Sequence, residues 1–361
     1  MRNIEYNLTI SVNDLEVSYN DNGLEGVPVL IFIHGFPFNK SMWNKQMDAL
    51  MADFRVISYD IRGHGNTDKG EADFSIELFA RDLIGFMDAL KVDKAVLCGL
   101  SMGGYISLNA ITSFPERFNA LILSDTNCIA DTPEAREKRL KSIDTIKANG
   151  MEWYADVSTK NLFAPQSFLT KTAEIEFVKE MILKTSQQSI FDTLLALSNR
   201  KETCSKLMQI KVPVLILVGK EDKITPPEAA ERMHIRIEES YLKIIEQAGH
   251  VSNLENPGEF NDQLRKFLVK ICREVMAPSP EKSSVADDSE QDLNAKILKI
   301  TMTIKDHYPE LSKYLEEMPV TIPKEIDPKI TSKNLSQYYE SLNSLLNKYL
   351  LEHPQYAKKQ K

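Results

Sequence analysis

The sequence has little cysteine, no excess of positive charge and no long apolar segment, and each absence narrows the class of protein. Four cysteines without CxxC or other metal-ligand spacing predict no metal site, and we interpret them as buried free thiols in a reducing cytoplasm. The formal net charge of −8 disfavours nucleic acid and anionic membranes as partners. No apolar run reaches membrane-spanning length, and Glu5 interrupts any N-terminal signal, so a soluble, cytoplasmic protein is expected. The cysteines are Cys98, Cys128, Cys204 and Cys272.

Apolar runs alternate with helix-like segments through residues 8–275. Continuous runs of this kind are typical of strands buried on both faces of a parallel sheet. The alternation therefore predicts an α/β fold, in which a mostly parallel sheet is flanked by helices. The expected strands are 9–12, 15–19, 29–33, 55–59, 95–98, 120–123, 214–218 and 242–245, and the expected helices are 43–51, 76–90 and 105–114.

The alternation breaks at two places, and each break predicts a change in architecture. Residues 126–210 are helical in character and follow one strand, so we expect a helical lid near the mouth of the sheet. Residues 277–291 are rich in proline, serine and acids, which is typical of a flexible linker. We therefore expect a main domain over 1–276 and a small helical C-terminal module over 292–361.

The end of one predicted strand carries the most informative motif of the chain. Residues 99–103 read Gly-Leu-Ser-Met-Gly, directly after the apolar run 95–98 and directly before helix-compatible residues. In such a strand–turn–helix element the serine hydroxyl stands exposed at the top of the sheet. The small residues on either side keep neighbouring side chains clear of the sharp turn. Ser101 is therefore the predicted nucleophile.

A serine nucleophile needs a base, and the base needs a carboxylate that holds its tautomer. His250, in a loop after the last predicted strand, is the best candidate among six histidines. Asp222 follows the run 214–218, at a strand end where active-site loops gather, and is the predicted acid. Glu221 and Asp125 are the alternatives. The chain order Ser101, Asp222, His250 is the order expected of a nucleophile on this kind of turn.

Five segments together resemble the α/β-hydrolase fold family over residues 8–275. They are His-Gly-Phe-Pro at 34–37, Asp-Ile-Arg-Gly-His-Gly at 60–65, and the Ser101, Asp222 and His250 loops. The resemblance implies that the backbone N–H groups of Phe36 and Met102 form an oxyanion hole. It also implies that His34 orients its loop, and that Arg62 and His64 brace the site without taking part in catalysis.

Serine at the nucleophile position separates this chain from dehalogenases and epoxide hydrolases of the same fold, which carry aspartate there. The pattern looks most like carboxylesterases and 3-oxoadipate enol-lactonases, which implies cofactor-free cleavage of carboxylic esters of small to medium substrates through an acyl-enzyme. Enol-lactonase, cofactor-free haloperoxidase or perhydrolase, thioesterase and carbon–carbon bond hydrolase activities are alternatives, as is a binding protein that has lost catalysis. The lid shows no cationic cluster that a dicarboxylate substrate would demand, which disfavours the enol-lactonase. We expect a small ester or lactone as partner, with Met102, Trp153 and Phe38 lining the pocket.

The C-terminal module adds a feature outside the usual hydrolase pattern. Residues 278–361 contain twelve lysines, thirteen acids and no arginine, so the charge is balanced and gives no preference for nucleic acid. Apolar residues recur at helical spacing from Leu293 to Ile304 and from Leu335 to Tyr349. We expect two helices that pack on the body or form a homodimer, with covering the active-site mouth or recruiting a partner as the alternative.

Overall fold

The computed structural model describes residues 3–276, 290–308, 311, 313 and 332–352. Two units separate along the chain, residues 1–277 and residues 278–361. The expected linker over 277–291 lies almost wholly outside the described residues. None of the helices in the described ranges combines the length and the apolar character that crossing a bilayer requires.

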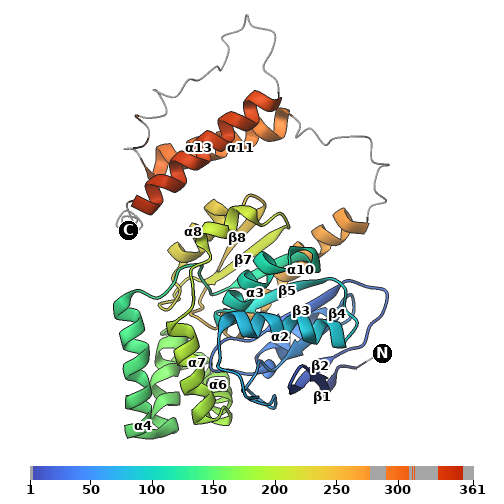
Figure 1. Cartoon of the computed structure of the whole chain (residues 1–361), viewed down its shortest axis with the longest axis vertical. Helices are drawn as coiled ribbons and strands as arrows, with labels where there is room; N and C mark the ends of the chain where they lie inside the picture. Colours follow the sequence, from blue (N-terminus) through green and yellow to red (C-terminus); the bar gives the residue numbers. More distant parts are fainter. Residues whose placement is uncertain (1–2, 277–289, 309–310, 312, 314–331, 353–361) are drawn as a thin grey trace, which may run out of the picture. The chain divides into compact units, whose positions relative to one another are not determined.

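Unit 1 is built on an eight-stranded sheet with the order β1-β2-β4-β3-β5-β6-β7-β8 (Figure 1). The β1–β2 and β2–β4 pairs are antiparallel, and every other pair is parallel. The prediction of a mostly parallel α/β sheet is therefore confirmed. The strands are β1 Glu5–Val12, β2 Leu15–Asp21, β3 Val29–Ile33, β4 Arg55–Tyr59, β5 Ala95–Leu100, β6 Phe118–Ser124, β7 Val214–Gly219 and β8 Ser240–Ile245.

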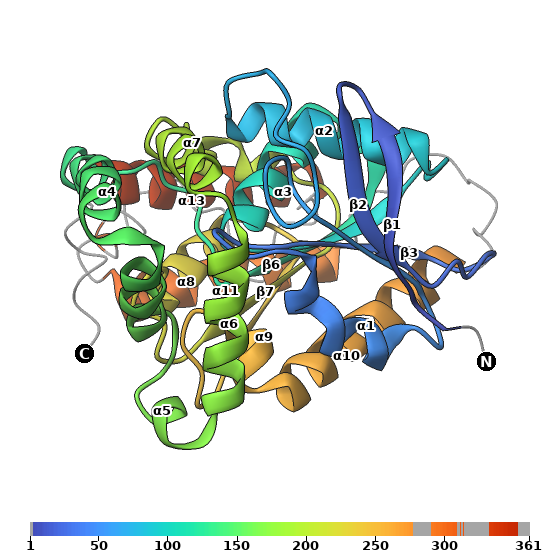
Figure 2. The same ribbon diagram turned by 90° about the horizontal axis from the view of Figure 1, so that it is seen from below.

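Helices cover both faces of the sheet, because the central strands bury side chains on each side. In Figure 2, α2 (Ile76–Ala89) and α3 (Met102–Ser113) lie on one face, and α1 (Asn44–Leu50) and α10 (Pro257–Met276) lie on the other. Strand β5 shows the consequence, since all six of its residues are buried. The remaining elements of this body are η1 Lys40–Trp43, η2 Pro115–Arg117, α8 Pro227–Arg236 and α9 Ser252–Glu255.

A helical insertion, residues 125–213, separates β6 from β7, where the sequence predicts a lid. Its helices α4, α6 and α7 gather together to one side of the sheet (Figure 1). Gly150, at φ 84 and ψ 175, interrupts α4 at a backbone conformation that is almost restricted to glycine. The elements of the insertion are α4 Pro133–Leu162, α5 Ser167–Thr170, α6 Thr172–Lys184, α7 Gln187–Ser198 and η3 Cys204–Gln209.

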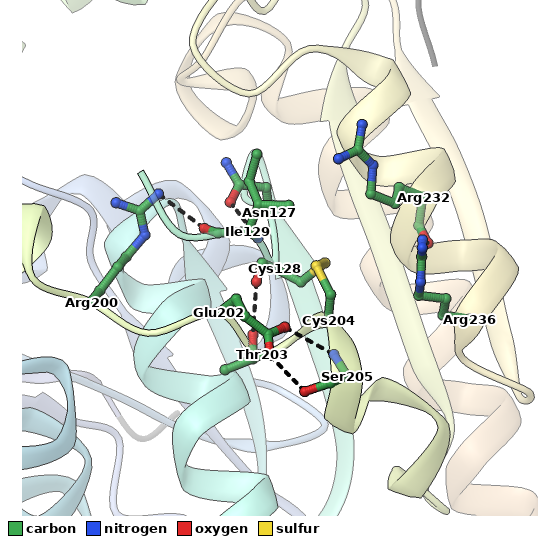
Figure 3. The surroundings of a disulfide bond; sticks show 10 residues. All are labelled: Asn127, Cys128, Ile129, Arg200, Glu202, Thr203, Cys204, Ser205, Arg232 and Arg236. Atoms are coloured by element: carbon green, nitrogen blue, oxygen red, sulfur yellow. Dashed lines mark hydrogen bonds between the residues drawn. A yellow bond between two sulfur atoms is a disulfide. The ribbon is translucent and has the colours of Figure 1, made fainter. Parts of the chain in front are cut away.

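A disulfide joins the two stems of the helical insertion (Figure 3). Cys128 lies just after β6 and Cys204 just before β7, and the bond closes a sequence separation of 76 residues. Thr203 N also donates a hydrogen bond to Cys128 O at 2.8 Å. The sequence-based interpretation of these two cysteines as free thiols is therefore wrong, because the fold brings together residues whose spacing gave no signal. Cys98 and Cys272 are free, as expected.

Unit 2 contains the two expected amphipathic helices, α11 (Glu290–His307) and α13 (Ser332–Glu352). The two helices contact each other. Their shared core includes Ile304 and Leu342, both with no exposed surface. The prolines predicted to separate the helices, at 319, 323 and 328, lie outside the described residues.

Candidate active site

Ser101 lies between β5 and α3 in a strained backbone conformation. Its φ is 54° and its ψ is −110°, in the positive-φ region that residues other than glycine rarely occupy. Such strain is typical of a serine presented at the top of a strand–turn–helix element. Gly103 is required by packing, because a Cβ there would lie 2.2 Å from Ile33 O at the end of β3. The turn therefore presses against the neighbouring loop that carries Phe36.

The fold brings Ser101, His250 and Asp222 into one hydrogen-bonded chain. His250 Nε2 lies 2.9 Å from Ser101 Oγ, and His250 Nδ1 lies 2.8 Å from Asp222 Oδ2. The His250 and Asp222 side chains are almost completely buried, whereas Ser101 retains accessible surface. A base and its carboxylate are thus shielded from water, while the hydroxyl can meet a substrate.

The loop after β7 holds the Asp222 carboxylate in place. Its Oδ1 accepts hydrogen bonds from Ile224 N and Thr225 N, and its Oδ2 accepts one from Thr225 Oγ1 at 2.8 Å. Burial alone would raise the pKa of Asp222, but the charge and hydrogen bond of His250 lower it below its usual value. The carboxylate therefore stays ionised and accepts a hydrogen bond from Nδ1–H, so that Nε2 is free to take a proton from Ser101.

His250 has the opposite pKa shift. Burial alone would lower its pKa, but the charge and hydrogen bond of Asp222 raise it above the usual 6.5. The His250 backbone is also fixed from outside its own loop, because its N–H donates to Leu162 O at 2.7 Å at the end of α4. Gly249 permits this approach, since a Cβ there would lie 2.7 Å from the same carbonyl.

The two backbone N–H groups predicted to form an oxyanion hole, those of Phe36 and Met102, have no hydrogen-bond acceptor among the described residues. Met102 is the first residue of α3, where an N–H has no carbonyl of its own helix to bond. Within the described residues, no hydrogen bond engages the N–H of Phe36 either. Gly35 lies against this turn, because a Cβ there would approach Leu100 O to 3.3 Å. The loop that carries Phe36 thus packs against the turn that carries Met102, and their role as an oxyanion hole stays a prediction.

The 34–37 and 60–65 segments are joined to each other by hydrogen bonds and ring contacts. Ile61 N donates to His34 Nε2 at 3.0 Å, and His34 Nδ1 lies 2.8 Å from Gly35 O. Arg62, buried, forms ion pairs with Asp82 and Asp14. His64 is also buried and lies under Phe36, with ring centroids 6.1 Å apart. These contacts give the segments a bracing arrangement, as the family resemblance implies for them.

The surroundings of Phe36 differ from the predicted pocket lining. Phe38 has no exposed surface and packs into the core behind the loop, so in this structure it offers a substrate no surface, and its role as a substrate contact stays a prediction. Trp153 is 38% exposed and lies outside the apolar cluster that packs on Phe36, whereas its neighbour Tyr154 belongs to that cluster. The spacing of Ile143, Ile146, Met151 and Tyr154 along α4 is the signal that identifies this face. The other members come from α7 and are Ile190, Phe191 and Leu194.

Two further buried acids support the site, and sequence reasoning did not assign these roles. Glu255 accepts hydrogen bonds from Gly249 N, Ala164 N and Ser167 Oγ, which ties the His250 loop to the insertion. Asp125 contacts the loops of the site without hydrogen bonding to His250. Glu221, an alternative acid, instead accepts from Gln166. Apart from Gly249 and Ser124, the partners lie 55 to 127 residues away in the sequence, so no local pattern reveals them.

Comparisons with known proteins match the body and the insertion together. A model of the alpha/beta hydrolase family matches residues 30–263, well over half of the chain. The chain is 29% identical over 264 residues to 3-oxoadipate enol-lactonase 2 of Acinetobacter baylyi, covering 73% of this chain and 97% of that protein. A thermophilic esterase from Thermogutta terrifontis superposes with a TM-score of 0.69 at 32% identity, covering 73% of this chain and 98% of that one. The enol-lactonase from Burkholderia xenovorans LB400 gives a TM-score of 0.68 at 26% identity, covering 73% and 100%.

This chain belongs to the alpha/beta hydrolase family. The resemblance seen in the sequence is thereby confirmed. The proteins that this chain is similar to include esterases and enol-lactonases. The family match ends at residue 263, so unit 2 lies outside it.

Proposed function

We propose that this protein is a serine hydrolase that cleaves carboxylic ester bonds through an acyl-enzyme, without a cofactor. The observation that carries the proposal is the unbroken chain from Ser101 Oγ through His250 to Asp222, with contacts of 2.9 and 2.8 Å. Separations of this size allow a proton to pass from the hydroxyl to the imidazole as the hydroxyl attacks. The similarity to esterases supports the same reaction class.

In the first half of the reaction, Ser101 Oγ attacks the acyl carbonyl and His250 Nε2 takes the serine proton. The tetrahedral intermediate places its oxyanion against the N–H groups of Phe36 and Met102. Each such donor contributes about 2.7–4 kcal/mol of transition-state stabilisation. His250 then protonates the departing alcohol, and the ester acyl group remains on Ser101. In the second half, His250 activates water, which releases the acid and restores the serine.

The helical insertion supports a preference for neutral, apolar substituents. The cluster beside Phe36 is aliphatic and aromatic, and its members Ile143, Met151 and Tyr154 are only partly buried. Two arginines of the insertion, the partly buried Arg139 and the buried Arg200, both form ion pairs with Asp131. The Asp131 carboxylate offsets one of their two positive charges, so it weakens the attraction that these arginines could offer a substrate carboxylate.

Enol-lactone hydrolysis is the second candidate, and similarity to two enol-lactonases favours it. The chemistry at Ser101 is the same, because a lactone is a cyclic ester whose alcohol stays tethered to the acyl group. The pairing of Arg139 and Arg200 with Asp131 makes them weaker partners for the one carboxylate that a 3-oxoadipate enol-lactone keeps outside its ring. We therefore rank linear and uncharged cyclic esters first.

The test is turnover of p-nitrophenyl esters from acetate to decanoate, with 3-oxoadipate enol-lactone and a neutral lactone beside them. We expect hydrolysis of the neutral esters, with a preference for a chain length that the insertion sets. Ser101→Ala is expected to remove this turnover and the labelling of the protein by a fluorophosphonate. Ester hydrolysis that persists in folded Ser101→Ala would exclude the acyl-enzyme. Turnover of the enol-lactone alone would favour the second candidate.

A further inference from the structure

The segment that follows β6 contacts all three loops of the candidate site. Ser124 O accepts a hydrogen bond from Ser101 N at 2.9 Å. Thr126 Oγ1 donates to Ser101 O at 2.8 Å. The peptide groups on both sides of the nucleophile are therefore held by residues 124 and 126, and Asp125 lies between these two contacts.

The Asp125 side chain continues this network toward the acid and the base. It has no exposed surface, and its Oδ1 accepts a hydrogen bond from Gly219 N at 2.8 Å, where β7 ends and the Asp222 loop begins. Its Oδ2 accepts from Ser252 Oγ at 2.5 Å, just after His250, and from Ser124 Oγ at 2.7 Å. One carboxylate thus bonds to the loops that deliver both Asp222 and His250.

The backbone of Asp125 has a strained conformation that hydrogen bonds maintain. Asp125 has a φ of 45°, in the left-handed region that costs energy for most residues and that aspartate tolerates better than most. Its own N–H donates to Leu217 O at 2.9 Å. The strain is therefore maintained by bonds on both the main chain and the side chain, which is typical of positions that shape a functional site.

We propose that Asp125 is a positioning residue of this hydrolase, which holds the Ser101, Asp222 and His250 loops in register and places a second negative charge near the base. Asp125 acts through other groups, because its hydrogen bonds go to residues that flank the triad. The inference rests on the proposed function, since it assigns Asp125 a role in the same reaction.

The negative charge of Asp125 gives the proposed role an effect on the pH dependence of activity that a purely structural residue would not have. The titratable groups that interact with Asp125 are Asp222 after β7, His250 after β8 and the Cys98 thiol of β5. Burial, and then the charge of Asp222, raise the pKa of Asp125 to about 7. The pKa of His250, which burial alone would lower, is raised by Asp222 and further by Asp125.

The sign of the pH effect follows from the state that catalysis needs. His250 must be neutral to act as a base, so activity falls as the pH drops through its raised pKa. Asp125 is charged only above its own pKa of about 7, and there its charge adds to those of Asp222 and Glu255 in raising the pKa of His250. Replacing Asp125 by asparagine removes that contribution and lowers the pKa of His250. The acid limb of kcat/KM should therefore move to lower pH, although a less well stabilised imidazolium makes each turnover slower.

The experiment compares Asp125→Asn, Ser252→Ala and wild type over pH 5–9 on the best p-nitrophenyl ester. We expect Asp125→Asn to lower kcat by roughly 10- to 100-fold, the effect of a small misplacement of catalytic groups, and to move the acid limb to lower pH. Ser252→Ala keeps the Asp125 carboxylate but removes one of the hydrogen bonds that it accepts. We therefore expect kcat to fall less than in Asp125→Asn and the acid limb of the pH profile not to move. Asp21→Asn, which removes a buried carboxylate of β2, is the matched control and should leave the pH profile unchanged.

The outcomes separate this inference from the proposed function. Wild-type kcat and an unmoved acid limb in Asp125→Asn would overturn the positioning role while Ser101-dependent turnover stands. If wild type itself shows no Ser101-dependent turnover, the proposed function fails, and NMR titration of His250 in Asp125→Asn decides the inference by whether its pKa falls. If Asp125→Asn does not fold, a wild-type kcat in Ser252→Ala overturns the inference, and a reduced kcat at an unmoved limb supports it.

Discussion

Helices α3 and α4 represent two regions of unit 1 that are built in different ways. Nine of the twelve residues of α3 are buried, whereas only four of the thirty residues of α4 are. Helix α3 begins at the nucleophile turn and packs against the sheet, while α4 lies in the insertion and shares a small cluster with α7. The region that carries the Ser101 turn therefore has a densely buried helix, whereas α4 of the insertion is mostly exposed.

The insertion packs on the body through apolar residues such as Ala155, Val178 and Leu197, which belong to the two large core clusters, and specific bonds add to this packing. The disulfide and the Thr203–Cys128 hydrogen bond close the stems of the insertion. Glu255 and the bond from His250 N to Leu162 O tie the end of α4 to the base loop.

The largest expected effect belongs to the dense region. Asp222→Asn should lower kcat by about 10⁴-fold, because an amide cannot hold the Nδ1–H tautomer of His250 or stabilise its charge. Glu221→Gln is the matched control, since Glu221 bonds to Gln166 and should leave kcat within a few-fold of wild type. Steady-state kinetics on one ester decide between them. A greater loss of kcat in Glu221→Gln than in Asp222→Asn would show that Glu221 is the acid and that our assignment of Asp222 is wrong.

The second effect concerns the stems of the insertion. Replacing Cys128 and Cys204 together by serine should cost up to about 4.5 kcal/mol of unfolding free energy, because a bond over 76 residues restricts the unfolded chain strongly. Urea unfolding of oxidised protein measures the loss. Cys272→Ser, at a free and half-buried thiol, is the control and should be close to neutral. Equal stability of the double variant and wild type would show that the bond adds nothing to the fold.

The smallest effect tests the break in α4. Gly150→Ala should lower the free energy of unfolding by about 1–3 kcal/mol, because alanine resists the positive φ of this residue. Crowding does not contribute, since no atom lies within 4 Å of a Cβ added at this position. Gly258→Ala, in α10 with equally open space and no positive φ, should instead stabilise by up to about 1 kcal/mol. Thermal unfolding compares the two. Stabilisation by both would indicate that α4 straightens at no cost.

Much of the fold could be predicted from sequence because its signals are local. The runs 29–33 and 55–59 form β3 and β4 with the same boundaries, since strands buried on both faces must be continuously apolar. Ser101, Asp222 and His250 were identifiable for a related reason. Each follows a predicted strand, and the carboxyl ends of parallel strands meet at one edge of the sheet.

The sequence by itself thus determined the α/β architecture, the place of the helical insertion and the candidate triad. Only the tertiary structure decided that Cys128 meets Cys204, that Phe38 turns into the core, and that Asp125 bonds to the loops of both acid and base. The physical reason is the range of the interactions. A buried strand or a sharp turn is specified by neighbours in the chain, whereas a disulfide, a core contact or a shared carboxylate depends on where distant segments come to lie.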